Sequence, residues 1–266
     1  MEVSSHGINQ ARINAFKFDI IALTNLYSDH LDYHLNINNY HNVKIAFINN
    51  VVRCKHILVN ENYKNKFTSN KIEFFKSSKN ILDKFNTLNF NKENMYLAYL
   101  ILTKIFKHKN MIETINNIKL DNGRGYIINH NNRKIVIDYA HQSKSFEAIL
   151  NDNNYNKVVV FGCGGNRDKS KRSEMGKIAC KYCKYVIITS DNSRNEPIDN
   201  IINDITKNID DYIVLKDRKE AIKYAINTYP NLDIYILGKG NEDYIIQGNN
   251  FINHNDIKYV KELIHF

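Results

Sequence analysis

Two arginines in neighbouring polar segments have the chemistry to hold an anionic group. Arg167 lies within GCGGNRDKSKR, residues 162–172, and Arg194 ends the segment DNSR, residues 191–194. A guanidinium presents a planar fork of N–H donors that matches a carboxylate through two parallel hydrogen bonds. The two arginines could therefore converge on one carboxylate or another anion.

The sequence around these segments predicts a parallel βαβ unit. Residues 158–161 are a β-branched run, residues 175–182 have a helical pattern, and residues 185–189 form a second apolar run. Strand, loop, helix, strand and loop in this order are typical of such a unit. Ligands bind beyond the carboxyl ends of its strands, and both arginine segments are expected there.

The rest of the chain predicts two α/β domains. Short apolar runs predict further strands, and two longer stretches predict helices. The expected strands are residues 19–24, 54–59, 135–138, 212–215 and 234–237, and the expected helices are residues 95–107 and 218–228. We place the boundary near Gly123, giving domains of residues 1–121 and 122–266, the second a doubly wound, Rossmann-like domain.

Composition narrows the class of protein. The 266 residues carry a net charge of +9, but the lysines are scattered and no aromatic RNA-binding motif accompanies them, so nucleic-acid binding is disfavoured. An anionic nucleotide substrate would suit a basic cleft.

Four cysteines form no disulfide framework, and the pair Cys180 and Cys183 lacks a second ligand pair, so buried thiols are favoured over a metal site. No signal peptide or apolar run of membrane-spanning length is present, which favours a reducing, cytoplasmic setting without a membrane partner.

Several motifs, in one order along the chain, resemble those of the Mur ligases that add the third residue of the peptidoglycan stem peptide. Residues 162–172 resemble their GCGG-(D/E)-RD-KGKR loop, and residues 191–194 resemble D-N-P-R. MEVSSHG at residues 1–7, DYAH at residues 138–141 and GKGNE at residues 238–242 also match. The resemblance covers the whole chain but only the C-terminal part of the family, a partial central ATPase domain followed by the C-terminal domain.

This resemblance implies a binding site for the acceptor amino acid meso-diaminopimelate. Gly238 would allow close backbone approach, and Glu242 could pair with an ammonium. Arg194 would favour diaminopimelate over lysine, because only diaminopimelate has a second carboxylate. Serine replaces the family's proline at position 193, and asparagine replaces its histidine at position 241. The implied site comprises Arg167, Asp191, Asn192, Ser193, Arg194, Gly238 and Glu242.

The resemblance also implies sites for the other substrates and for Mg²⁺. Their members are Ser4, Gln10 and Arg12 for UDP-N-acetylmuramoyl-L-alanyl-D-glutamate, Asn94, Arg124 and Asp138 for ATP, and Glu2, His30 and Lys44 for the metal. Lys44 would be carbamylated, which turns a cation into an anion, and Lys44 and His30 are the implied catalytic residues. Ordinary structural roles compete with these assignments: Ser4, Ser5 or Asn91 can cap helices, and most helix lysines only face water.

The expected function is therefore the C-terminal part of an ATP-dependent amide ligase. No G-x-x-G-K-(S/T) phosphate loop occurs in the sequence, and the lysine of 238–242 has the wrong spacing to replace it. We expect the chain to be inactive without an N-terminal half carrying that loop, which could be a separate polypeptide. The alternatives are a lysine-adding ligase and a non-catalytic remnant or ligand-binding subunit.

Overall fold

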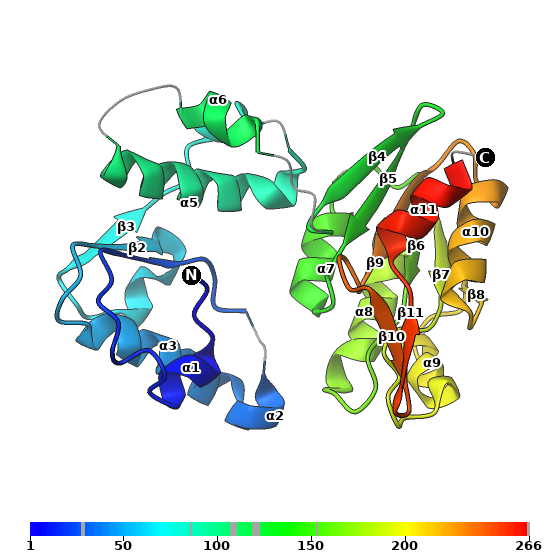
Figure 1. Cartoon of the computed structure of the whole chain (residues 1–266), viewed down its shortest axis with the longest axis horizontal. Coiled ribbons are helices and arrows are strands. Elements are labelled where there is room, and N and C mark those ends of the chain that lie inside the picture. The colour runs from blue at the N-terminus through cyan, green and yellow to red at the C-terminus, as the bar shows by residue number, and fades with distance from the viewer. Residues whose placement is uncertain (28–29, 86, 107–110, 119–122, 153, 265–266) are drawn as a thin grey trace. The chain divides into compact units, whose positions relative to one another are not determined.

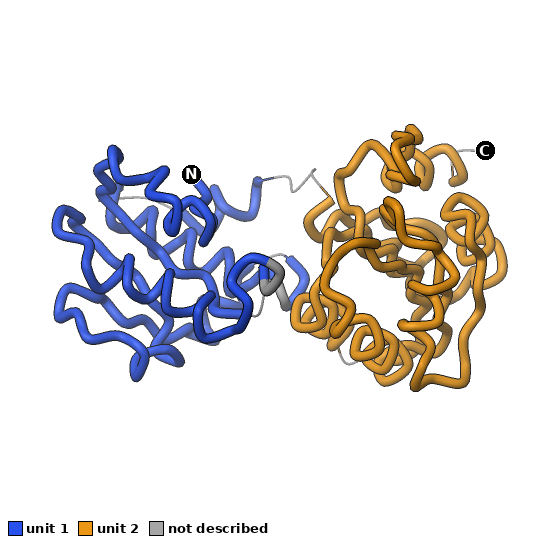
Figure 2. The backbone as a smooth tube through the Cα atoms, turned by 90° about the horizontal axis from the view of Figure 1, so that it is seen from below, with its two compact units in different colours: residues 1–118 blue, residues 119–266 orange. Residues whose placement is uncertain are grey.

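The computed structural model describes residues 1–266 except 28–29, 86, 107–110, 119–122, 153 and 265–266. The chain forms two compact units, residues 1–118 and residues 119–266 (Figure 2). The boundary predicted between residues 121 and 122 lies outside the described residues.

The first unit contains a three-stranded parallel sheet in the order β1-β2-β3 (Figure 1). Its strands are β1 (Ile20–Leu23), β2 (His56–Asn60) and β3 (Ile72–Phe75), and α3 (Ile37–Asn50) connects the first two. Alternate strand residues form a core with Ile48 of α3. Strand β2 begins two residues later than predicted, and residues 57–59 are its buried part.

The remaining described helices of this unit vary in length from four to 17 residues. They are α1 (Ser5–Asn9), α2 (Leu31–His34), the 3₁₀ helix η1 (Glu61–Lys66), α4 (Lys79–Leu82), α5 (Asn89–Ile105) and α6 (Met111–Asn116). The helix expected over residues 95–107 begins earlier, at Asn89, with Leu88 at its N-cap. A capping role for Asn91 is therefore wrong, because Asn91 lies inside the first turn. Tyr96 of α5 packs with Phe85 and Ile115 in a second core.

The second unit is built on a six-stranded sheet in the order β4-β5-β9-β6-β7-β8 (Figure 1). The strands are β4 (Tyr126–His130), β5 (Arg133–Asp138), β6 (Lys157–Phe161), β7 (Tyr185–Ile188), β8 (Ile213–Val214) and β9 (Asp233–Leu237). Strand β4 is antiparallel to β5, and the other neighbouring pairs are parallel. The helices are α7 (Ser143–Leu150), α8 (Ser170–Tyr182), α9 (Ile198–Thr206), α10 (Arg218–Thr228) and α11 (Asp256–Ile264), and a hairpin of β10 (Tyr244–Gln247) and β11 (Asn250–Asn253) precedes α11.

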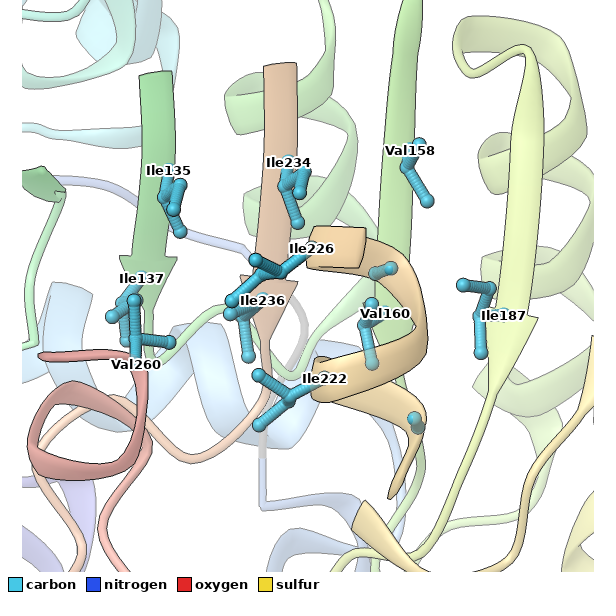
Figure 3. Packing of buried hydrophobic residues seen from close by; sticks show 12 residues of the cluster. Ile135, Ile137, Val158, Val160, Ile187, Ile222, Ile226, Ile234, Ile236 and Val260 are labelled. Carbon is cyan, nitrogen blue, oxygen red and sulfur yellow. The ribbon is translucent and has the colours of Figure 1, made fainter. Parts of the chain in front are cut away.

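The strand order confirms the predicted doubly wound fold. The chain runs outward from β6 through β7 to β8 and then returns to β9, which lies between β5 and β6. Because parallel crossovers are right-handed, this reversal puts α10 on the opposite face from α8 and α9. Figure 3 shows Ile222 and Ile226 of α10 packed over Ile234, Ile236 and Val160 of the sheet.

The register of the sheet aligns the ends of four strands. Asp138 pairs with Leu237, Leu237 pairs with Phe161, and Phe161 pairs with Ile188. The loops that follow β5, β6, β7 and β9 therefore leave the sheet along one edge. Three of these loops carry the motifs predicted to bind the acceptor.

Helix α10 has its predicted ends, whereas α8 begins at Ser170 instead of residue 175. Cys183 is buried as expected, Cys180 is only partly buried, and both thiols are free. Burial raises the pKa of Cys163 and of Cys183 to about 12. Among the described residues, no helix combines the length and apolar character needed to cross a bilayer.

Candidate functional site

The loops after β6 and β7 pack backbone against backbone. Gly165 N donates to Asn192 O over 2.9 Å. A Cβ on Gly165 would lie 1.9 Å from Ser193 O, and one on Gly162 would lie 2.3 Å from Thr189 O. Glycine is therefore required at both positions, because any side chain would force the loops apart.

Arg194 is held in place through its backbone as well as its side chain. Its φ is +52°, in the left-handed region. Its N–H donates to Ile246 O over 3.0 Å, and its carbonyl accepts from Gly248 N over 2.7 Å. Its Nη1 donates to Gly165 O and to Asn192 O over 3.0 and 3.2 Å. The β10–β11 hairpin, which the sequence analysis did not predict, thus fixes the residue expected to bind a carboxylate.

The structure brings Arg167 and Arg194 to the same glycine. A Cβ on Gly164 would lie 3.1 Å from Nη1 of Arg194 and 3.8 Å from Cγ of Arg167. Arg194 is half-buried and Arg167 is exposed. That the two arginines bind one anion together remains a prediction. Their placement around one glycine is consistent with this prediction.

Asp191, Asn192, Ser193 and Glu242 lie close together beside these arginines. The first three are 5–8% exposed. Asp191 Oδ1 accepts from Asn192 N over 2.5 Å, and Asn192 Nδ2 donates to Glu242 Oε2 over 2.8 Å. The carboxylate and amide groups of the loops after β7 and β9 therefore form one hydrogen-bonded set.

Lys239 is a member of this set that the sequence analysis missed. Its side chain is fully buried, and its ammonium lies 2.7 Å from Glu242 Oε2, 3.2 Å from Asn192 Oδ1 and 3.7 Å from Asp191 Oδ1. The sequence suggests for this lysine only a comparison with a phosphate-loop lysine. Its place directly after a buried strand, three residues before Glu242, was the signal that could have identified it.

A buried ion pair supports the loops from the side of α8. Both Nη atoms of Arg172 donate to the Glu196 carboxylate over 2.7 and 2.8 Å, and Nη2 also donates to Gly164 O over 3.0 Å. Glu196 accepts from Asn166 N over 2.9 Å. The hydrogen bonds from Arg172 hold the pKa of Glu196 well below its usual range.

Two of the residues predicted to bind ATP, Asp138 and Arg124, lie at the end of β5. The carboxylate of Asp138 is buried and accepts from Gly125 N and Ala140 N over 2.6 and 2.7 Å. Burial raises its pKa, because the loss of hydration outweighs these hydrogen bonds and the nearby charge of Arg124. The guanidinium carbon of Arg124 lies 4.5 Å from the ring centroid of Tyr139. In this structure Asp138 anchors the surrounding backbone, and Arg124 is exposed.

The residues predicted to bind the muramoyl substrate lie in the first unit, near α1. Ser4 caps this helix by accepting from Gly7 N over 3.1 Å, which is the structural role that the sequence left open. Gln10 donates to the hydroxyl of Tyr33 over 3.3 Å, and Arg12 is exposed. Asn94, the third predicted ATP contact, is exposed on α5.

The predicted metal ligands Glu2, His30 and Lys44 all lie in the first unit. Glu2 and His30 are exposed, and the ring of His30 lies 4.7 Å from that of His6. The Lys44 ammonium lies 4.7 Å from the ring centroid of Tyr40. Among the described residues, no group of three or more His, Cys, Asp or Glu side chains could hold a metal ion. Mg²⁺ usually takes only one or two carboxylates from a protein, so its assignment to these residues remains a prediction.

Both α/β units match models of a known protein family. The family model of the Mur ligase middle domain matches residues 1–118, and that of the Mur ligase, glutamate ligase domain matches residues 123–241. The chain therefore belongs to the Mur ligase family.

Similar proteins point to one branch of that family. The UDP-N-acetylmuramoyl-L-alanyl-D-glutamate–2,6-diaminopimelate ligase of Rickettsia rickettsii is 34% identical, and the alignment covers 99% of this chain and 64% of the relative. The ligase of the same name from Buchnera aphidicola is 33% identical over 99% of this chain and 62% of its own length. The chain thus spans less than two thirds of these relatives.

Solved structures give the same fold. A UDP-N-acetylmuramoyl-L-alanyl-D-glutamate–2,6-diaminopimelate ligase is 25% identical with a TM-score of 0.57, covering 99% of this chain and 63% of that one. A pseudomurein peptide ligase type C from Methanothermus fervidus, at 16% identity, has a TM-score of 0.62 over 99% of this chain and 66% of its own.

Proposed function

We propose that this chain supplies the middle and C-terminal parts of an ATP-dependent ligase. The ligase joins meso-diaminopimelate to UDP-N-acetylmuramoyl-L-alanyl-D-glutamate in the cytoplasm during peptidoglycan synthesis. The names of the similar proteins support this substrate pair. In this reaction ATP phosphorylates the terminal carboxylate of the muramoyl peptide and leaves as ADP. The acceptor amine then attacks the acyl carbon, loses its proton as the amide bond forms, and expels phosphate.

One observation carries the proposal: the Arg194 guanidinium and the Glu242 carboxylate are both hydrogen-bonded to Asn192 at the end of the sheet. Arg194 and Arg167 approach Gly164, while Asn192 is hydrogen-bonded to Glu242. Diaminopimelate carries two ammonium and two carboxylate groups, so it needs both kinds of partner. Burying an anion is costly unless a well-aligned charged donor meets it, and Arg194 can supply such a donor.

We also propose which residues bind the other substrates and the metal ion. Ser4, Gln10 and Arg12 would contact the muramoyl substrate, and Asn94, Arg124 and Asp138 would contact ATP. Glu2, His30 and a carbamylated Lys44 would support Mg²⁺. When bound, this ion neutralises charge on the transferring phosphoryl group.

Arg194→Ala tests the acceptor assignment. We expect wild-type protein to bind meso-diaminopimelate in preference to L-lysine, because only diaminopimelate offers the distal carboxylate. A hydrogen bond to a charged group contributes about 1.5–3 kcal/mol, so the variant should bind diaminopimelate about ten- to a hundredfold more weakly. Arg194→Lys should recover part of the loss, because it restores a point charge without the planar fork. Isothermal titration calorimetry with each amino acid gives these affinities.

The matched control is Arg53→Ala, which removes an exposed arginine from the first unit and should leave binding unchanged. Two results would refute the acceptor assignment. One is the absence of diaminopimelate binding by the wild-type chain, and the other is equal binding by wild type and Arg194→Ala. Equal affinity for lysine and diaminopimelate would instead favour a lysine-adding ligase.

A further inference from the structure

Lys239 follows β9 directly after Gly238, and its side chain has no exposed surface. A lysine is rarely fully buried unless its charge is compensated. Here the compensation comes from the Glu242 carboxylate at 2.7 Å and the Asp191 carboxylate at 3.7 Å. These two residues come from different loops, one after β9 and one after β7. Lys239 therefore neutralises the charge where the two loops meet.

The side chains of Lys239, Asn192 and Glu242 are hydrogen-bonded to one another in a ring. Its Nζ donates to Asn192 Oδ1 over 3.2 Å and to Glu242 Oε2 over 2.7 Å. The ring is completed by Asn192 Nδ2, which donates to the same Glu242 Oε2 over 2.8 Å. The lysine contact fixes which way the Asn192 amide points, because only its oxygen can accept from an ammonium. The ring therefore sets the orientation of both Asn192 and Glu242.

This arrangement leaves the other carboxylate oxygen of Glu242 on the outer side of the ring. Its Oε1 has a long contact of 3.4 Å with the hydroxyl of Tyr139, while Oε2 receives both ring donors. A carboxylate has room for about four hydrogen bonds. Oε1 thus retains acceptor capacity for an incoming ammonium.

The orientation of Asn192 also reaches the hairpin that holds Arg194. Asn192 Oδ1 accepts a second hydrogen bond, from Ile246 N over 2.9 Å. The carbonyl of the same residue, Ile246, accepts from Arg194 N over 3.0 Å. Lys239, through Asn192, is therefore linked to both residues expected to hold the acceptor, to the carboxylate of Glu242 and to the backbone of Arg194.

We propose that Lys239 is a positioning residue that fixes Asn192 and Glu242 to receive the ammonium group of the acceptor amino acid. This assignment rests on the proposed function for the nature of the ligand. Lys239 does not touch the ligand in this proposal; it acts through the two side chains that it orients. Without its charge, Glu242 and Asp191 repel each other, and Asn192 Oδ1 keeps only the hydrogen bond from Ile246 N.

The test compares Lys239→Met with Lys157→Met in the full chain. Lys157 is the matched control, because it is also fully buried and bonds Asp152 and Leu150 O, but lies at the start of β6, the opposite end of the strand from the site. Both variants should lose stability in urea denaturation. Only Lys239→Met should weaken meso-diaminopimelate binding in calorimetry, by about ten- to a hundredfold, since charged hydrogen bonds are lost from the site.

A second readout does not depend on any ligand. The amide of Ile246 bonds to Asn192 Oδ1, so its hydrogen exchange, followed by NMR, reports the orientation of that side chain. We expect its exchange to accelerate in Lys239→Met and stay unchanged in Lys157→Met. The amide of Gly248, bonded to Arg194 O, gives the reference within the same hairpin. If Lys239→Met does not fold, Lys239→Gln retains a donor without the charge and should show a smaller acceleration and an intermediate affinity.

The outcomes separate this inference from the proposed function. Wild-type binding of diaminopimelate, with unchanged affinity and unchanged Ile246 exchange in the Lys239 variant, would overturn the role of Lys239 alone. No wild-type binding, but faster Ile246 exchange in the variant, would overturn the acceptor assignment while supporting the orienting role of Lys239. If Lys157→Met loses as much affinity for diaminopimelate as Lys239→Met, the loss follows from lower stability of the fold. That result would also overturn the inference.

Discussion

Gly238 and Gly248 show how much the site depends on single backbone positions. Both have positive φ, +109° at Gly238 and +57° at Gly248. A Cβ on Gly238 would lie 2.8 Å from Asp191 Oδ2, whereas nothing lies within 4 Å of the position on Gly248. Backbone strain therefore acts at both glycines, but a steric conflict with the site arises only at Gly238.

Alanine at each glycine separates these two effects. Gly248→Ala should lower the free energy of unfolding by about 1–2 kcal/mol, the cost of a left-handed conformation for an L-residue. Gly238→Ala should cost about 1–3 kcal/mol more, because its side chain also displaces the Asp191 carboxylate. Urea denaturation of the two variants measures both changes. A larger loss in Gly248→Ala would contradict the close approach of Asp191 to Gly238.

At the scale of elements, the first turn of α8 is bonded to a partner distant in sequence. Arg172 lies in its first turn, is fully buried and bonds Glu196 and Asp204. Its contact with Gly164 O ties the helix to the loop after β6, and Glu196 belongs to the segment after β7. One ion-paired cluster thus joins the first turn of a helix to two loops that carry the site.

Glu196→Gln should test this cluster. Breaking a buried ion pair by neutralising one partner costs about 3–5 kcal/mol, because the other charge stays buried. Asp204→Asn is the matched control: Asp204 contacts the same guanidinium, but its side chain is 42% exposed, so its loss should cost less than about 1 kcal/mol. Thermal and urea unfolding give both values. Similar losses in the two variants would show that Glu196 does not hold the loops together.

At the scale of the whole molecule, each unit has a hydrophobic core of its own. In the second unit, a buried ion pair also joins α10 to the start of α11. Arg218 of α10 donates to Ser190 O and Leu237 O over 3.2 and 3.0 Å, next to the ends of β7 and β9. It also pairs with Asp256 at the start of α11 over 2.8 Å. Burial alone would raise the pKa of Asp256, but the charge and hydrogen bonds of Arg218 and a hydrogen bond from His254 hold it well below its usual range.

This pair predicts how stability changes with pH. A carboxyl whose pKa is lower in the folded state contributes stability that is fully present above its unfolded value, about pH 4, and is lost as the pH falls. Asp256→Asn should cost about 3–5 kcal/mol at pH 7, and the difference from wild type should shrink below pH 4. Urea denaturation at pH 7 and pH 3 tests this. The same difference at both pH values would mean that Asp256 is not the titrating group.

The local pattern of apolar residues in the sequence was sufficient to predict many of the strands and helices of the second unit. The apolar runs at 158–161 and 234–237 became the buried parts of β6 and β9, and helix α10 has its predicted ends. These segments are readable from sequence because strand and helix periodicity follow from which residues must face a core. The loops after β6, β7 and β9 could also be placed at one edge, because parallel strands end on the same side of their sheet.

The groups that organise the candidate site could not be predicted in this way. The sequence alone determined the fold class of the second unit and the residue types available to bind an amino acid. Only the tertiary structure decided that Lys239 is buried between Asp191 and Glu242, that the β10 strand fixes Arg194, and that Arg172 in the first turn of α8 pairs with Glu196. These features depend on hydrogen bonds and ion pairs between segments far apart in the chain. Local periodicity carries no information about them, because it reports only whether a side chain faces the core or water.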